Sequence, residues 1–140
     1  MNTISDGILA ARLGPAIRED GQTIRQDFSF PPEFVGFAGH FPEEAILPAV
    51  VQIGLGVVLS QALLAEKTGH QRLKTVTRAK FLRKLKPGET ITARCSRCAR
   101  CGPGGGACNV VLTVDQQQAA AYTLTFTLAS TSEPGAPADG

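Results

Sequence analysis

The stretch GHFPEEAILP, residues 39–48, leads directly into a segment without charged side chains, residues 49–65. This segment predicts a helix over residues 48–67, because proline is tolerated in a first helical turn, where Pro48 lies, and Gly69 is a typical stop signal. Since the segment is apolar on almost all sides, it is typical of a central helix enclosed by a sheet. These residues therefore decide the fold that we expect.

Strand-like patterns lie on both sides of this helix. Residues 8–13 are a possible short strand, and residues 22–30 alternate better before two prolines end them. One long helix with a run of strands predicts an α+β fold, in which a strongly curved antiparallel sheet wraps around the central helix and a second copy protects what remains open. Four further strands are expected after the helix, arranged as a meander: residues 74–85, 90–101, 108–115 and 121–129.

Length and composition fit a single domain over residues 1–130, followed by a disordered tail over residues 131–140. A net charge of +2 among 140 residues gives no indication of nucleic-acid binding. Residues 1–20 contain no apolar core of signal-peptide length, which favours a cytoplasmic protein. The uncharged stretch 45–65 is long enough to span a bilayer, but its proline, glycines and polar side chains argue against membrane insertion.

Basic side chains are concentrated in one part of the chain, residues 74–86, where no acidic residue accompanies them. Two interpretations stay open at this point. The cations form either a solvated strand face that discourages edge pairing or a contact surface for an anionic partner such as a phosphate-bearing carrier. The residues are Lys74, Arg78, Lys80, Arg83, Lys84 and Lys86.

The four cysteines, at positions 95, 98, 101 and 108, invite a zinc or iron–sulfur interpretation. On an extended strand a spacing of three sends consecutive side chains to opposite faces, so Cys95 and Cys101 share one face while Cys98 points to the other. We therefore expect no metal. A disulfide between Cys101 and Cys108 is open only in an oxidising compartment, and free thiols are expected in the cytoplasm.

A histidine just before the central helix suits proton transfer or the binding of a polar ligand group, because its pKa lies near neutrality. Several short motifs accompany this residue, His40, in a fixed order: GHFP at 39–42, LP at 47–48, VVQI at 50–53, KFL at 80–82 and KPGE at 86–89. Their order and spacing resemble the hot-dog-fold 3-hydroxyacyl-(acyl carrier protein) dehydratases, and most of all the smaller dehydratase-like proteins of aryl polyene clusters. The likeness covers about residues 28–89, and the strand pattern extends it to residue 129.

The resemblance implies a dimer or higher oligomer with active sites in the interface, acting without a cofactor on the thioester of an acyl carrier protein or of coenzyme A in lipid biosynthesis. It implies that His40 removes an α-proton and that the backbone N–H of Ala49 donates to the thioester oxygen. Apolar residues would hold the acyl chain, and basic residues would contact the carrier protein. The first group is Phe37, Phe41, Leu47 and Phe81, and the second is Arg78, Lys80, Arg83 and Lys84.

One position departs from the family pattern. The family's Glu or Asp stands fourteen residues after the histidine, and that position here is Gly54. Loss of a positioned general acid typically lowers a rate by about 10² to 10⁴. Substitutes within the chain are Glu43, Glu44 or a water held by Gln52, and a mixed dimer could instead obtain the carboxylate from another hot-dog subunit. The alternatives are a non-catalytic acyl-thioester-binding subunit and a hot-dog thioesterase.

Overall fold

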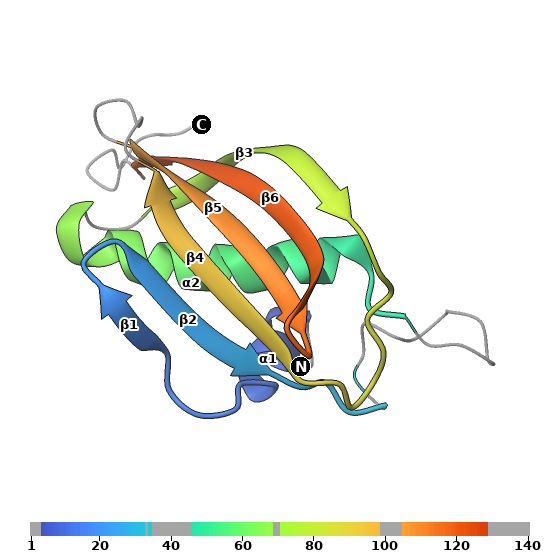
Figure 1. Ribbon diagram of the computed structural model, residues 1–140. Helices are drawn as coiled ribbons and strands as arrows, with labels where there is room; N and C mark the ends of the chain where they lie inside the picture. The colour runs from blue at the N-terminus through green and yellow to red at the C-terminus, as the bar shows by residue number, and fades with distance from the viewer. Residues whose placement is uncertain (1–3, 33, 35–45, 69–70, 99–104, 129–140) are drawn as a thin grey trace.

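A computed structural model describes residues 4–32, 34, 46–68, 71–98 and 105–128 (Figure 1). The expected tail and the end of the predicted domain lie outside these residues. The order of elements is α1 (Ile4–Ala10), β1 (Ile17–Asp20), β2 (Thr23–Phe28), α2 (Ala49–Thr68), β3 (Gln71–Phe81), β4 (Ile91–Cys98), β5 (Gly105–Val114) and β6 (Gln117–Leu128).

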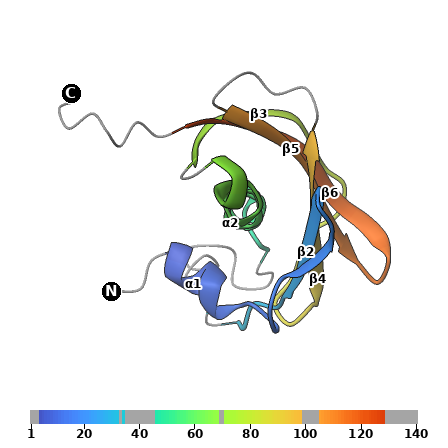
Figure 2. The same cartoon turned by 90° about the vertical axis from the view of Figure 1, so that its left-hand side faces the viewer.

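The six strands form one antiparallel sheet in the order β1-β2-β4-β5-β6-β3, which curves around α2. Figure 2 looks along α2 and shows the sheet on one side of it, with α1 and β3 on opposite flanks of the helix. The bounds of α2, Ala49–Thr68, confirm the predicted central helix. The expected curved sheet around one long helix is likewise confirmed.

The prediction of a meander after the helix is right for β4, β5 and β6 but wrong for β3, which pairs with β6 instead of β4. Because α2 separates β2 from β3 in the sequence, β3 returns on the other flank of the helix, and β4 to β6 fill the sheet between them. The turn between β5 and β6 also lies earlier than expected, at Asp115 and Gln116. Both residues have positive φ, 53° and 67°, as a tight two-residue hairpin turn requires.

The N-terminal strand expected over residues 8–13 is wrong: residues up to Ala10 form α1. Ile8 and Ala11 are buried, and their three-residue spacing places both on the side of α1 that packs against α2. Extended pairing begins only at Arg12, which bridges to Phe28. The short strand β1 follows and was not expected from the sequence.

The core lies between α2 and the concave face of the sheet. Gly56 of α2 allows the closest approach, because an added Cβ would lie 2.6 Å from the Tyr122 hydroxyl and 2.9 Å from Cγ2 of Val110. The helix and the sheet are therefore locked together near the middle of α2. The largest fully buried side chains are Phe28, Phe30, Leu47, Val51, Leu55, Leu59, Leu64, Leu85, Ile91, Leu112 and Leu124.

The cysteines follow the expected strand alternation where they are described: Cys95 is buried and Cys98 is half-buried. Cys108 is also buried and is hydrogen-bonded to Cys95, whose sulfur lies 3.2 Å from the Ser60 hydroxyl. The hydrogen bond with Cys108, together with burial, raises the pKa of the Cys95 thiol. Cys101 lies outside the described residues. Among those described, no group of His, Cys, Asp or Glu side chains could hold a metal ion, and no helix is long and apolar enough to cross a membrane.

Candidate functional site

The backbone at the start of α2 offers a free hydrogen-bond donor. Pro48 precedes the helix, and its carbonyl accepts from the N–H groups of Val51 and Gln52, at 3.0 and 3.1 Å. The N–H of Ala49, the first helical residue, has no acceptor within the part of the chain that the structure describes. Because a helix N-terminus carries a partial positive charge, this N–H suits an oxygen on which negative charge develops.

The predicted base His40 and the predicted substrate contacts Phe37 and Phe41 lie outside the described residues. The other two predicted substrate contacts both lie near the start of α2. Leu47 is buried, and its N–H donates to the carbonyl of Leu85 at 2.8 Å, so the loop after β3 is tied to this end of the helix. Phe81, at the end of β3, is 42% exposed.

Gly54, at the position of the missing acid, faces the N-terminal helix of its own chain. A Cβ at Gly54 would lie 2.7 Å from Cδ1 of Ile8. Val58, one turn later, borders a cavity of about 520 Å³ between α1, α2 and β2. The cavity is lined by Leu9, Arg12, Gly14, Pro15, Ala16, Gln26, Val58, Leu59 and Ala62. This flank of α2 packs within the chain and presents no carboxylate.

A buried polar network crosses from α2 to β6. The Tyr122 hydroxyl donates to the carbonyl of Gln52 at 2.5 Å and accepts from the N–H of Gly56 at 3.2 Å. The Gln52 side chain donates to the carbonyl of Leu47 at 3.0 Å, while its Oε1 has no partner among the described residues. Burial raises the pKa of Tyr122, so the hydroxyl stays protonated. This network was not expected from the sequence. Tyr122 is the single tyrosine of the chain and stands in an alternating strand pattern, which could have indicated a buried hydroxyl.

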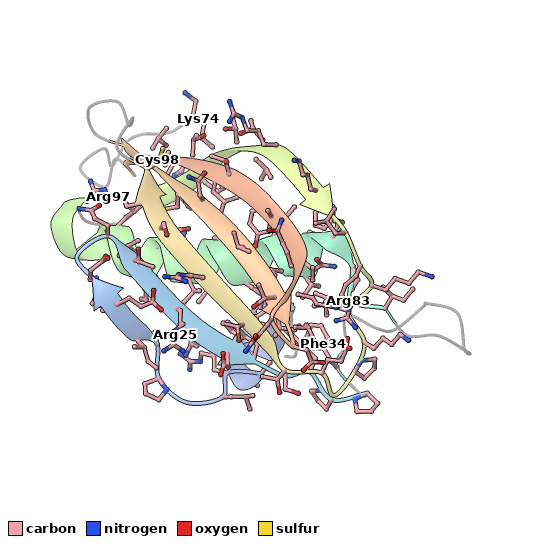
Figure 3. The ribbon with its side chains drawn as sticks, viewed as in Figure 1. Arg25, Phe34, Lys74, Arg83, Arg97 and Cys98 are labelled. Carbon is pink, nitrogen blue, oxygen red and sulfur yellow. The ribbon has the colours of Figure 1, made fainter. Side chains whose placement is uncertain are left out.

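The predicted carrier-contact residues differ in their exposure to solvent. Arg78, Lys80 and Lys84 are exposed. Arg83, labelled in Figure 3, is half-buried, and its Nη2 lies 2.8 Å from Oε2 of Glu89, whose Oε1 accepts from the Lys86 N–H at 2.8 Å. Burial alone would raise the pKa of Glu89, but the bonds from Lys86 and Arg83 outweigh it and lower the pKa.

The second nitrogen of that guanidinium, Nη1, is buried without a partner among the described residues. Arg83 therefore holds the loop after β3 in place and keeps one donor unused.

Apolar side chains remain uncovered on one flank of α2 near its start. Val50 is 65% exposed, and Ile53 and Val57 follow it at helical spacing and are half-buried. Phe81 and Leu82, 42% and 59% exposed, lie at the end of β3 and just beyond it, near the start of α2 (Figure 1). Exposed apolar side chains near a free strand edge are typical of a protein interface.

Sequence comparison identifies related proteins. The family model described as ApeI dehydratase, ApeI-like, matches residues 16–102, which is more than half of the chain. The 3-hydroxyacyl-(acyl-carrier-protein) dehydratase FabZ of Clostridium novyi is 31% identical over 94 residues, covering 64% of this chain and 66% of the relative. FabZ of Staphylococcus aureus is 33% identical over 99 residues, covering 66% of this chain and 65% of the relative. The chain thus spans slightly less than two thirds of these curated relatives.

Structural comparison establishes the hot-dog fold. The dehydratase heterocomplex ApeI:P from Xenorhabdus doucetiae superposes with a TM-score of 0.67 at 21% identity, covering 83% of this chain and 96% of that one. A hypothetical thioesterase from Streptococcus pneumoniae, solved with coenzyme A, reaches a TM-score of 0.70 at 8% identity, covering 91% and 94% of the two chains. At such identities these structures speak for the fold alone, which is the fold expected from the sequence.

Proposed function

Because the chain belongs to the ApeI-like dehydratase family, we propose that it binds a 3-hydroxyacyl thioester and contributes half of a dehydratase site. In this proposal His40 removes a proton from C2, and the N–H of Ala49 binds the thioester oxygen. The electron pair of the broken C–H bond forms the C2–C3 double bond, and the C3–O bond breaks. The hydroxyl leaves as water after it receives a proton from a general acid.

The observation that carries this proposal is the contrast between two positions on α2. Ala49 has the donor that the reaction needs, unpaired among the described residues, while Gly54 is packed against Ile8 and supplies no acid. We therefore assign the acid to a second hot-dog subunit. The structural neighbour from Xenorhabdus doucetiae is itself a heterocomplex, which supports a mixed assembly.

The same proposal places the subunit interface at β3. This strand has a neighbour on one side only, and the uncovered apolar flank of α2 lies beside it. A partner strand would satisfy the free backbone groups of β3 and cover Val50 and Phe81. Lys80 and Lys84, exposed near the same end of α2, would then meet the anionic carrier of the substrate.

The test is loss of water from a medium-chain 3-hydroxyacyl carrier protein, followed by mass spectrometry. Ala49→Pro deletes the proposed donor, and proline is tolerated at a first helical position, so the helix should be kept. We expect Ala49→Pro to lower turnover about 10² to 10³-fold. Ala49→Gly, which retains the N–H, is the matched control, and His40→Ala should abolish the reaction.

Two outcomes contradict the proposal. Equal turnover by Ala49→Pro and Ala49→Gly would remove the helix N–H from the mechanism. Tight substrate binding by the wild-type chain without any turnover, even when a carboxylate-bearing hot-dog subunit is bound, would make the protein an acyl-thioester-binding subunit instead.

A further inference from the structure

The sheet ends on one side in a long free edge. β3 is eleven residues long and is hydrogen-bonded to β6 alone, so the backbone groups on its other side are unpaired within the sheet. The opposite edge, β1, is only four residues long. Long free edges invite pairing with another chain, and β3 is therefore the edge whose chemistry decides which chain can pair.

Every charged residue of β3 is basic. Arg72, Lys74, Arg78 and Lys80 are all exposed, and no acidic residue occurs in the strand. Lys74 lies toward the end of the sheet opposite to Arg83, so the cations run along the strand (Figure 3). Within the described part of the chain, none of the four has a carboxylate partner.

The carboxylates of the other edge are already engaged. Glu19 of β1 pairs with Arg25 of β2 at 2.9 Å and with Arg94 of β4 at 2.5 Å. Asp20 accepts from the N–H of Gln22 at 2.7 Å. Pairing of β1 from one copy with β3 from another would therefore offer β3 few free acidic groups.

Two copies of β3 would bring only cations to their common seam. Because the strand has no acid, no register can place a cation of one copy opposite a carboxylate of the other. Like charges directly opposite destabilise a strand pair, and opposite charges stabilise it.

We infer that β3 is a charge-selective docking edge that disfavours a second copy of this chain and accepts the edge strand of another hot-dog subunit carrying Asp or Glu. This inference rests on the proposed function, which takes a second hot-dog subunit as the source of the acid. Burial of the uncovered apolar flank of α2 would stabilise the complex with any hot-dog subunit. The cations of β3 would favour a partner strand that carries Asp or Glu.

The test mixes fluorescently labelled wild-type chain with unlabelled chains and measures association by sedimentation velocity. The edge-reversed variant combines Arg72→Glu with Lys74→Glu, which gives β3 two acids to face the cations of the wild-type strand. The control variant combines Arg12→Glu with Lys86→Glu and has the same net charge, but neither position lies on β3. Each mixture is measured at about 50 mM and about 1 M NaCl, since only the high salt screens charges a few ångströms apart.

At low salt we expect the wild-type chain to bind the edge-reversed variant about tenfold more tightly than it binds itself. The preference should shrink at high salt, and the control variant should bind as weakly as the wild type. Equal affinity for all three chains, or no association with any of them, would overturn the inference.

Dehydration and substrate binding, measured on the same samples, separate this inference from the proposed function. A wild-type chain that pairs tightly with itself and still dehydrates the thioester overturns the charge-selective edge alone. A clear preference for the edge-reversed chain without any thioester binding overturns the proposed function alone.

Discussion

Two neighbouring regions of α2 differ in what covers them. At Gly54 the side chain of Ile8 packs so closely that even a methyl group at this position would displace it. Val50, one turn earlier on the same side of the helix, is 65% exposed, and Ile53 and Val57 are only half-buried. The chain's own N-terminal helix covers the first region, and the described residues leave much of the second uncovered.

Gly54 stands at the position where the resemblance to the dehydratases leads us to expect an acid. A carboxylate at Gly54 would lie against Ile8, so the glycine serves packing between α1 and α2.

The largest expected effect comes from placing a carboxyl group at position 54. Gly54→Glu combined with Ile8→Ala restores a carboxyl group and opens the space for it. We expect dehydration by the chain alone to rise by about 10²-fold or more over the wild type. Mass spectrometry of the acyl carrier protein measures it, at high protein concentration and about 1 M NaCl, where the edge charges are screened.

Gly54→Gln with Ile8→Ala is the matched control, because it has the same shape and no acidic proton. Equal rates for the Glu and Gln variants would show that position 54 is not where the acid acts.

A pair of alanine substitutions compares the two regions directly. Ile8 is 3% exposed, and Ile8→Ala should lower the free energy of unfolding by about 2–4 kcal/mol because it leaves a cavity next to Gly54. Val50→Ala in the uncovered region should change it by less than about 0.5 kcal/mol. Urea denaturation of the dilute proteins measures both, and similar losses would contradict the contrast between the regions.

Removal of one hydroxyl tests the side of α2 that faces the sheet. Tyr122→Phe removes the buried hydroxyl that bonds to the Gly56 N–H and the Gln52 carbonyl, and we expect a loss of about 1–2 kcal/mol of stability. Thr123→Val is the control, since its hydroxyl bonds to Asn109 on the exposed side of the same strand and should matter by less than about 0.5 kcal/mol. A thermal melt that does not distinguish the two variants would contradict the locking role of Tyr122.

The smallest expected effect is a pH dependence in the loop after β3. The folded-state pKa of Glu89 is lowered from its ordinary value of 4.5, so the unfolded chain binds the proton more readily. The stabilisation by Glu89 is therefore present above 4.5 and is lost as the pH falls through the folded-state pKa. Glu89→Gln should cost about 0.5 kcal/mol at neutral pH, and the difference from wild type should shrink in acid. A constant difference across a pH series of urea titrations would contradict this assignment.

The sequence predicted the elements with strong periodicity. The uncharged segment after Pro48 forms α2 almost to the expected residue, and the alternating threonines of β6 form a half-buried strand. Weak or short patterns were misleading: the apolar residues around Ile8 fit a strand and a helix equally well over so short a length. Contact with α2 decides between the two, and such a contact is not visible in one segment.

The candidate site was predictable only where a motif marks it. The order of motifs leads us to expect a donor at Ala49 and an acid position at Gly54, which stay predictions, and the structure adds that Gly54 packs against Ile8. The packing of Ile8 on Gly54 and the bond from Tyr122 to α2 join residues far apart in the sequence. No local pattern encodes such contacts, because they depend on how the sheet curves around the helix.

The pairing of β3 with β6 has a consequence for biosynthesis. These strands are joined directly, although the whole of β4 and β5 lies between them in the sequence. On a ribosome that releases the chain from its N-terminus, β3 emerges early but has no neighbour to hold it until β6, the last strand, has been made. The β3 edge is thus held in the sheet only after β6 has been made, and a second subunit can pair with it only after that point.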